Sequence, residues 1–296
     1  MKAANSLENS KKKKGQLYEV WERLRVQPIA VICIVVLFIL FFIAIFADVI
    51  ADYKTKALMV VAENKLLSPS WEHIFGTDNF GRDLFARIVH GTRVVLLVAV
   101  TSTLISAVIG TLLSCTATLF GGKVDLIIMR FIDVLLGIPN LIIAIAICAG
   151  LGGGTWQLIV ALTITGITGQ TRMQRSRAIT IVHMEYIESA RALGASTIHI
   201  IIRHLVPNLT SIIFIGVTGS ISTNIMMISS LGFLGLGVPP PQPEWGLMLN
   251  NGVTYMARYP HMIIVPGIAI LITSLCVSTF GDMLRDAFDP MLKGRA

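Results

Sequence analysis

Three histidines in one segment are the side chains best suited to metal or proton chemistry. His183, His199 and His204 show no His-x-x-x-His spacing and no accompanying cysteines, so they do not form a recognisable metal-ligand pattern. We expect them on a polar surface or at a contact with another subunit. The sequence also contains no Gly-x-x-x-x-Gly-Lys-Ser/Thr loop, no Ser/His/Asp set and no paired carboxylates. We therefore predict no catalytic residue, metal or bound cofactor in this chain.

The four cysteines do not indicate redox or metal chemistry either. Each lies inside an apolar stretch, and none has a neighbour at a metal-ligand spacing. Thiols in separate apolar segments do not form a disulfide framework. We expect Cys33, Cys115, Cys148 and Cys276 to be small packing residues.

A charged cluster stands out in the first third of the chain. Gly76 and Gly81 bracket a predicted turn, and opposite charges follow closely enough to neutralise one another beside lipid headgroups. We expect mainly a structural role here, with direct substrate contact as the alternative. The residues of this candidate outer-face motif are Asp78, Gly81, Arg82 and Asp83, and Arg87 belongs with Asp78, Arg82 and Asp83 to the charges expected to neutralise one another.

The composition shows what kind of scaffold must position these groups. Hydrophobic residues make up 54% of the chain and charged residues only 14%, whereas a soluble domain has about 25% charged residues. The block Ile29–Ala47 has no polar side chain. A membrane-spanning helix needs about 20 apolar residues, and the apolar part of a signal peptide is shorter than this block. The block therefore predicts a retained membrane helix.

Further uncharged windows predict an all-α integral membrane protein with six spans. Gly150–Gly154 interrupts one long window, and the prolines after Val238 end another. Most of the Lys and Arg residues fall in segments that face the cytoplasm if the N-terminus does. We expect a cytoplasmic segment 1–28 with the Lys11–Lys14 run near anionic lipid, a permease-like domain 29–283 and a cytoplasmic tail 284–296. The predicted spans lie near 29–50, 94–118, 126–149, 156–174, 209–235 and 261–283.

The long polar loop between the fourth and fifth spans predicts two short helices. The first covers about 184–193 and breaks at Gly194, and the second covers about 196–206 with Ser196 as its N-cap. Pro207 is expected to restart the chain toward the next span. Because short helices are not stable alone, this pair should pack into a cytoplasmic partner.

The same loop, 184–207, resembles the EAA loop of ATP-binding-cassette importer permeases. That family has Glu-Ala-Ala, three residues, Gly, nine residues and Ile-x-Leu-Pro. Glu188, Ala190, Gly194 and Pro207 fall in register. Ser189, His204 and Val206 depart from the general pattern, and the Arg203-His204-x-x-Pro207 variant looks like the peptide-transport branch.

Other stretches resemble the C-type subunit of the dipeptide/oligopeptide/nickel permease family, and together they cover roughly residues 20–292. Several such motifs in a fixed order make chance agreement very unlikely. They are Phe75–Arg87 with Gly91-Thr-Arg93, Asp133–Pro139, Ser230–Gly237, Pro243–Gly246 and Gly281–Pro290.

The resemblance implies a type I importer permease of the bacterial cytoplasmic (inner) membrane with both termini cytoplasmic. It would be the permease subunit of an ATP-driven, binding-protein-dependent importer, most simply for dipeptides or oligopeptides. Implied partners are a homologous second permease in a heterodimer, two ATP-binding-cassette ATPases that bind ATP and magnesium, and an extracytoplasmic solute-binding protein, without nucleic acid. The implied ATPase-coupling residues are Glu188, Ala190, Arg191, Gly194, Ala195 and Pro207.

Three further expectations concern the spans and the outer loops. Asn224 and Met227 are candidates for the translocation pathway, with ordinary helix packing as the alternative. Trp245, after the rigid prolines, is expected at the depth of the membrane interface. Asp133 is expected to pair with Arg130, one helical turn before it.

The sequence leaves cargo and rival functions open. Dipeptides, oligopeptides, glutathione, nickel and metal chelates all remain candidate cargoes, and the two ATPases could be identical or different. An ion-gradient-driven carrier would need intramembrane carboxylates and inverted repeats, and neither is visible. A structural or receptor protein would not need a coupling loop.

Overall fold

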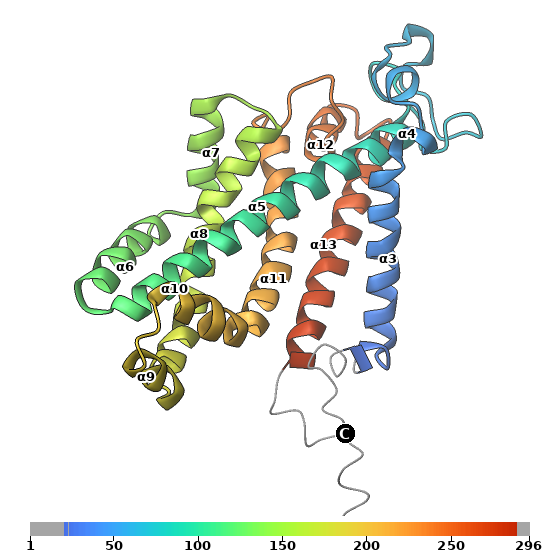
Figure 1. Cartoon of the computed structure of the whole chain (residues 1–296). Coiled ribbons are helices and arrows are strands. Elements are labelled where there is room, and N and C mark those ends of the chain that lie inside the picture. The colour runs from blue at the N-terminus through green and yellow to red at the C-terminus, as the bar shows by residue number, and fades with distance from the viewer. Residues whose placement is uncertain (1–20, 23, 289–296) are drawn as a thin grey trace, which may run out of the picture.

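Long helices run side by side through most of the chain, and shorter helices lie at both ends of the bundle (Figure 1). The computed structural model describes residues 21–22 and 24–288, so the expectations for 1–20 and for most of the tail lie outside the described residues. The elements are α3 (Pro28–Ile45), α4 (Ala47–Ile50), η1 (Tyr53–Leu58), η2 (Ala62–Asn64), α5 (Leu84–Phe120), α6 (Gly122–Leu136), α7 (Asn140–Leu151), α8 (Thr155–Val182), α9 (Glu185–Ala192), α10 (Thr197–Ile200), η3 (Ile201–Leu205), α11 (Val206–Phe233), α12 (Trp245–Val253) and α13 (His261–Phe288).

Four helical segments in the described part are long and apolar enough to cross a membrane: α3, α5, α10–α11 and α13. The bent pair α6–α7 would add a fifth. Helix α8 occupies the place of the predicted fourth span but is less apolar, because Thr, Gly and Gln residues take up much of its length. The count of six spans therefore stays a prediction.

The predicted span 126–149 is not one straight helix. It consists of α6 and α7, which meet at an angle of 85°. Pro139 causes the break, since it has no N–H to donate and restricts the residue before it, and it precedes the first residue of α7. The apolar pattern across 126–149 conceals this bend.

The loop between α8 and α11 follows the predicted pattern. Helix α9 ends at Ala192, Gly194 has φ of +79°, and the Ser196 side chain accepts a hydrogen bond from the His199 N–H. Helix α11 begins at Val206 with Pro207 in its first turn, where proline is tolerated, so the chain restarts toward the next span at the predicted place. The sequence did not predict that α10, η3 and α11 follow one another without a gap.

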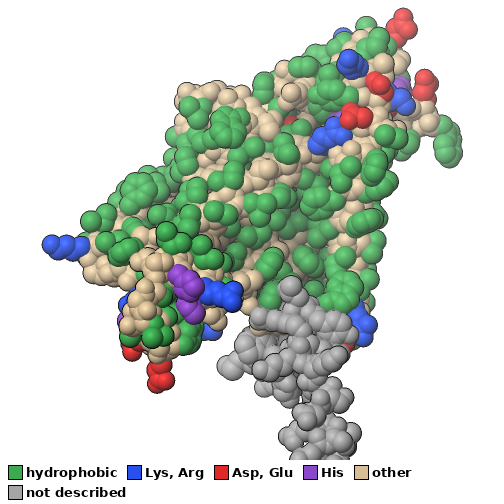
Figure 2. All heavy atoms as spheres, in the orientation of Figure 1, with side chains coloured by type: hydrophobic (Ala, Val, Ile, Leu, Met, Phe, Trp, Pro, Cys, Tyr) green, Lys and Arg blue, Asp and Glu red, His purple; other side chains and the backbone are tan. Residues whose placement is uncertain are grey.

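Small and apolar side chains fill the centre of the bundle. Helix α5 packs mainly against α8, and α11 packs against α13 and α5. Cys33, Cys115 and Cys148 are buried. Helix α3 lies at the edge, with most of its apolar side chains exposed. Figure 2 shows charged side chains gathered toward the two ends of this face, with mostly hydrophobic and backbone atoms between them.

Figure 1 also defines the two ends of the bundle. The end that carries α9 and α10 is called the α9 end below. The opposite end, which carries α4 and α12, is called the α4 end.

Candidate functional site

At the α9 end, the segment from Glu185 to Leu205 presents apolar side chains outward. Ile187 and Ile200 are buried against the bundle, whereas Leu193, Ile198 and Ile202 are 88%, 69% and 64% exposed. A cluster of this kind is typical of a surface that another protein covers. Glu188 is exposed on α9.

The predicted coupling residues hold the turn after α9 in shape. The Gly194 N–H donates to the Arg191 carbonyl at 2.9 Å, and the Ala195 N–H donates to the Ala190 carbonyl at 3.0 Å. This closes the helix with a left-handed residue, which glycine adopts without strain. The Arg191 guanidinium also donates to the Leu119 carbonyl at the end of α5. The segment is thus joined to two long helices, α5 through Arg191 and α11 by continuity.

A cavity of about 320 Å³ lies beside α8 and α11. The predicted pathway residues Asn224 and Met227 both line it. Its wall contains amides, hydroxyls, glycines and apolar groups, and none of the lining residues is ionisable. They are Leu136, Asn140, Thr165, Gly166, Thr168, Gly169, Gln170, Met173, Ile215, Gly216, Gly219, Ser220, Thr223, Asn224 and Met227.

Side-chain amides connect the helices around this cavity. The Asn224 amide donates to the hydroxyls of Ser102 and Thr103 on α5 at 3.1 and 2.9 Å. The Gln170 amide donates to the Ser220 hydroxyl at 3.0 Å, and its carbonyl accepts from Gln174 at 3.0 Å. Asn224 therefore ties α11 to α5 as well as lining the cavity.

The two glutamines were not singled out from the sequence. The sequence did contain a signal for them, because an amide inside an apolar span tends to face a cavity or another helix. Gln170 falls at the end of the uncharged window 134–171, and Gln174 follows it by one turn.

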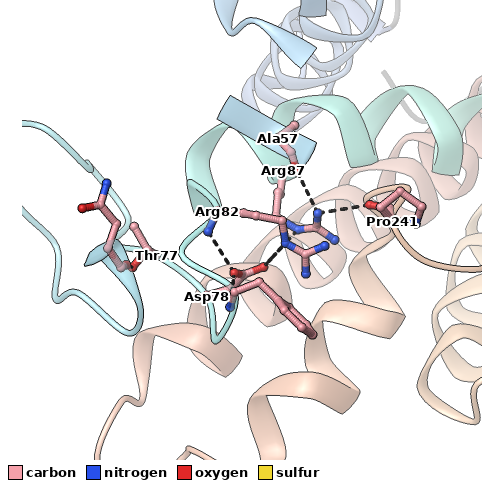
Figure 3. Close-up of polar contacts among 8 residues, drawn as sticks. Ala57, Thr77, Asp78, Arg82, Arg87 and Pro241 are labelled. Atoms are coloured by element: carbon pink, nitrogen blue, oxygen red, sulfur yellow. Dashed lines mark hydrogen bonds and ion pairs between the residues drawn. The ribbon is translucent and has the colours of Figure 1, made fainter. Parts of the chain in front are cut away.

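At the α4 end, Asp78 organises the charged cluster (Figure 3). Its Oδ2 lies 2.7 Å from Arg82 Nε and 3.6 Å from Arg87 Nε. Its Oδ1 accepts from the backbone N–H groups of Phe80 and Arg82. All three charged side chains are buried, so Asp78 offsets the charge of one arginine and the cluster keeps a net positive charge.

Arg87 extends this cluster to two distant segments (Figure 3). Its Nη1 donates to the Ala57 carbonyl at 2.8 Å and to the Pro241 carbonyl at 3.3 Å. Gly81 completes the turn with φ of +79°, and a Cβ there would lie 1.9 Å from the Val61 carbonyl oxygen. Only glycine fits this position.

Asp83 does not pair with the arginines, which corrects the expectation for this residue. Its Oδ1 caps α5 by accepting from the Ala86 N–H at 2.8 Å, and its Oδ2 lies 2.8 Å from His73 Nδ1. The N-cap position points the carboxylate at the helix N-terminus, away from Arg82.

Trp245 is buried in the protein core, and its expected position at the depth of the membrane interface stays a prediction. Its indole N–H donates to the Ile88 carbonyl at 3.1 Å. A Cβ on Gly91 would lie 2.7 Å from the ring, and a Cβ on Gly246 would lie 2.1 Å from the Ser229 carbonyl oxygen. The start of α12 is therefore packed directly onto the backbones of α5 and α11.

Glu244 is fully buried beside Trp245. Its carboxylate accepts from the N–H groups of Gly246 and Leu247 at 2.7 and 2.8 Å, and it lies against Gly232. Burial raises the pKa of this carboxyl to about 7, and the two backbone hydrogen bonds partly oppose that rise.

The carboxylates of α6 pair with arginines of α8. Asp133 contacts Arg172, not Arg130, which corrects the expected pair within one helix. Asp125 accepts two hydrogen bonds from Arg175 at 2.6 and 2.5 Å. These pairs hold the bent segment onto α8 near the cavity.

Comparison with known proteins decides the family. Residues 106–294 match the model of the binding-protein-dependent transport system inner membrane component, and residues 15–69 match the N-terminal TM domain of oligopeptide transport permease C. The chain belongs to the binding-protein-dependent transport permeases. It is thus a multi-pass inner-membrane permease, as the resemblance implied.

Individual relatives of the permease agree with this assignment. It is 40% identical to the glutathione transport system permease protein GsiD of Escherichia coli O6:K15:H31, over 94% of this chain and 91% of that protein. The same values hold for GsiD of Shigella boydii serotype 4. A chain of the MetNI methionine ABC transporter, solved in inward-facing conformations, has a TM-score of 0.55 at 17% identity, over 69% of this chain and 96% of that one. This confirms the all-α fold of a type I importer permease.

Family membership also bears on partners and cofactors. A permease of this family works with separate ATPase subunits, a partner permease and a binding protein, so ATP and magnesium belong to other chains.

Proposed function

We propose that this permease forms half of a translocation pathway for dipeptides or oligopeptides, and that its α9–α10 segment receives the movement of an ATPase. The observation that carries the proposal is the continuity of α10, η3 and α11. The exposed Ile198 and Ile202 at the α9 end and the α11 residues of the cavity wall belong to one run of helix without a gap.

In this proposal, Glu188, Ala190, Arg191, Gly194, Ala195 and Pro207 shape or flank the surface that docks on the ATPase. The exposed Leu193, Ile198 and Ile202 supply apolar contact area. Two ATPase subunits that close on ATP would shift this segment and tilt α11, so that the pathway alternates between inward-open and outward-open states.

The cavity supports a cargo with uncharged hydrogen-bonding groups. Asn140, Thr223 and Asn224 offer amide and hydroxyl groups, and no ionisable side chain lines the wall. Peptide main chains carry complementary donors and acceptors. The relatives named for glutathione transport also fit a peptide-like cargo, while nickel and metal chelates remain the alternatives.

Because the ATPases of this proposal are cytoplasmic, the α9 end would face the cytoplasm. Both termini would then be cytoplasmic, and the α4 end would face the solute-binding protein. Asp78, Gly81, Arg82 and Asp83 would brace the outer end of α5 without touching cargo, since Asp78 and Arg82 are buried and satisfied and Asp83 caps the helix.

Purification from the native membrane in mild detergent tests the proposal. Recovery of a second, homologous permease with one or two ATPases, and of a binding protein, is expected. Recovery of this chain alone, stable and without an ATPase, would contradict the role of the α9–α10 segment and favour an ion-driven carrier.

A further inference from the structure

At the α4 end, a tight turn presents a tryptophan to the outside. The Ser70 N–H donates to the His73 carbonyl at 2.8 Å, the His73 N–H donates to the Ser70 hydroxyl at 3.1 Å, and the Gly76 N–H donates to the His73 carbonyl at 2.8 Å. Within this turn, Trp71 is fully exposed and Ile74 is 56% exposed. Hydrogen bonds on both sides of the indole hold the turn in shape.

The turn is also fastened to the start of a long helix. The His73 imidazole contacts Asp83, which caps α5. The neighbouring Thr77 hydroxyl donates to the Asn64 carbonyl and accepts from the Leu67 N–H. Whatever binds Trp71 therefore holds the first turn of α5 as well.

The position of the turn favours lipid as its occupant. The segment follows α3 and α4, whose apolar side chains Phe38, Ile45 and Val49 are exposed at the edge of the bundle. In Figure 1 the segment lies on the right, above α3, whereas α6, α7 and α8, which line the cavity, lie on the left. A protein that delivers cargo to the cavity would contact the α4 end above α6, α7 and α8, not above α3.

The side chains of this segment match a lipid headgroup layer. Tryptophan prefers the membrane–water interface, where its ring is in apolar surroundings and its N–H remains hydrated. Lys54, Lys56 and Lys65 are exposed on the same outer segment, and they would meet lipid phosphates. Glu63 and Glu72 add opposite charges, as expected for a zwitterionic layer rather than a strongly anionic one.

We propose that Trp71 and Ile74 insert into the headgroup layer at the α4 end and fix the depth of the first turn of α5. Helix α5 has 37 residues, about 55 Å at 1.5 Å per residue, against an apolar core of about 30 Å. Figure 1 shows α5 running obliquely to α3, and the anchored turn sets the depth of its first turn.

Quenching of tryptophan fluorescence tests the anchor. The full complex is placed in nanodiscs of phosphatidylethanolamine and phosphatidylglycerol, with or without phosphatidylcholine brominated near the headgroup. The emission of Trp71 is obtained as the difference between wild type and Trp71→Phe, a change at a fully exposed position. We expect the brominated lipid to lower this emission at least twofold, and aqueous iodide to lower it much less.

A matched variant and the contrary outcomes complete the test. Ile74→Ser keeps Trp71 but weakens insertion, so iodide quenching should rise at least twofold. Iodide quenching without lipid quenching in the wild type would overturn the proposal. Protection from iodide only after a binding protein is added would overturn it too, since the occupant would be protein. The measurement needs neither cargo nor ATP, so its result does not depend on the proposed transport function.

Discussion

Arg87 and Pro241 are 154 positions apart in the chain, yet the Arg87 guanidinium donates to the Pro241 carbonyl at 3.3 Å. The same guanidinium faces the Asp78 carboxylate. One buried cation therefore joins the loop before α5 to the loop before α12.

Replacing Arg87 by methionine should lower stability strongly. Asp78 keeps its pair with Arg82. The Ala57 and Pro241 carbonyls, however, lose their donor, and each unsatisfied buried acceptor costs about 1–3 kcal/mol. The melting temperature in detergent measures the loss. Lys123→Met is the control, because it removes a positive charge from an exposed side chain, and surface changes of this kind cost about 0.5 kcal/mol or less. Equal losses in the two variants would contradict the structural role of Arg87.

Gly91→Ala should destabilise the junction of α5 and α12. The added Cβ would lie 2.7 Å from the Trp245 ring, and overpacking of this kind costs about 1–3 kcal/mol. Gly150→Ala serves as the matched control, since a Cβ there meets nothing within 4 Å. Thermal unfolding of both variants is the measurement, and an unchanged Gly91→Ala protein would show that Trp245 is not packed as described.

Stability should depend on pH through Glu244. Its folded-state pKa is raised from 4.5 to about 7, so the folded state holds a proton that the unfolded state has lost between these values. The contribution of Glu244 to the free energy of unfolding is complete below about pH 4.5. This contribution, about 3 kcal/mol, is lost as the pH rises through about 7. Glu244→Gln should flatten this part of the curve. Parallel stability–pH curves for both proteins would contradict the assignment.

Gly194→Pro and Glu188→Lys should abolish uptake while leaving membrane insertion intact. Proline cannot adopt the φ of +79° found at Gly194. Lysine would place a positive charge in the first turn of α9, where negative charge is favoured. Uptake by cells and the amount of chain in washed membranes are the two measurements. Normal transport in both variants would disprove the coupling role.

Gly219→Leu should block the cavity without disturbing the bundle. Gly219 lines the cavity, and a Cβ there meets nothing within 4 Å, so the larger side chain would project into open space. We expect loss of uptake with unchanged thermal stability and unchanged recovery of ATPase subunits. Wild-type uptake by this variant would place the pathway elsewhere.

Local signals in the sequence predicted several features correctly. The break at Gly194, the cap at Ser196 and the neutralisation of Asp78 by Arg82 all depend on residues within a few positions of one another. Glycine, N-cap and i,i+4 patterns encode such features directly.

Features that depend on distant segments were missed. Asp133 pairs with Arg172 on another helix instead of with nearby Arg130, and no local spacing shows which partner is closer. The burial of Trp245 depends on the space that Gly91 leaves on α5, and no local pattern links these two distant positions. The apolar pattern of 126–149 is equally compatible with a straight helix and with the bend at Pro139.

The continuity of α10, η3 and α11 has a mechanical consequence. From Thr197 to Phe233 the chain is helical over 37 consecutive residues, with the π-helical turn η3 directly before Pro207. Because no loop separates α10 from α11, a displacement at Ile198 is taken up by rotation of α11 or by bending at η3. The two hydrogen bonds from Asn224 to α5 would be the contact about which α11 turns.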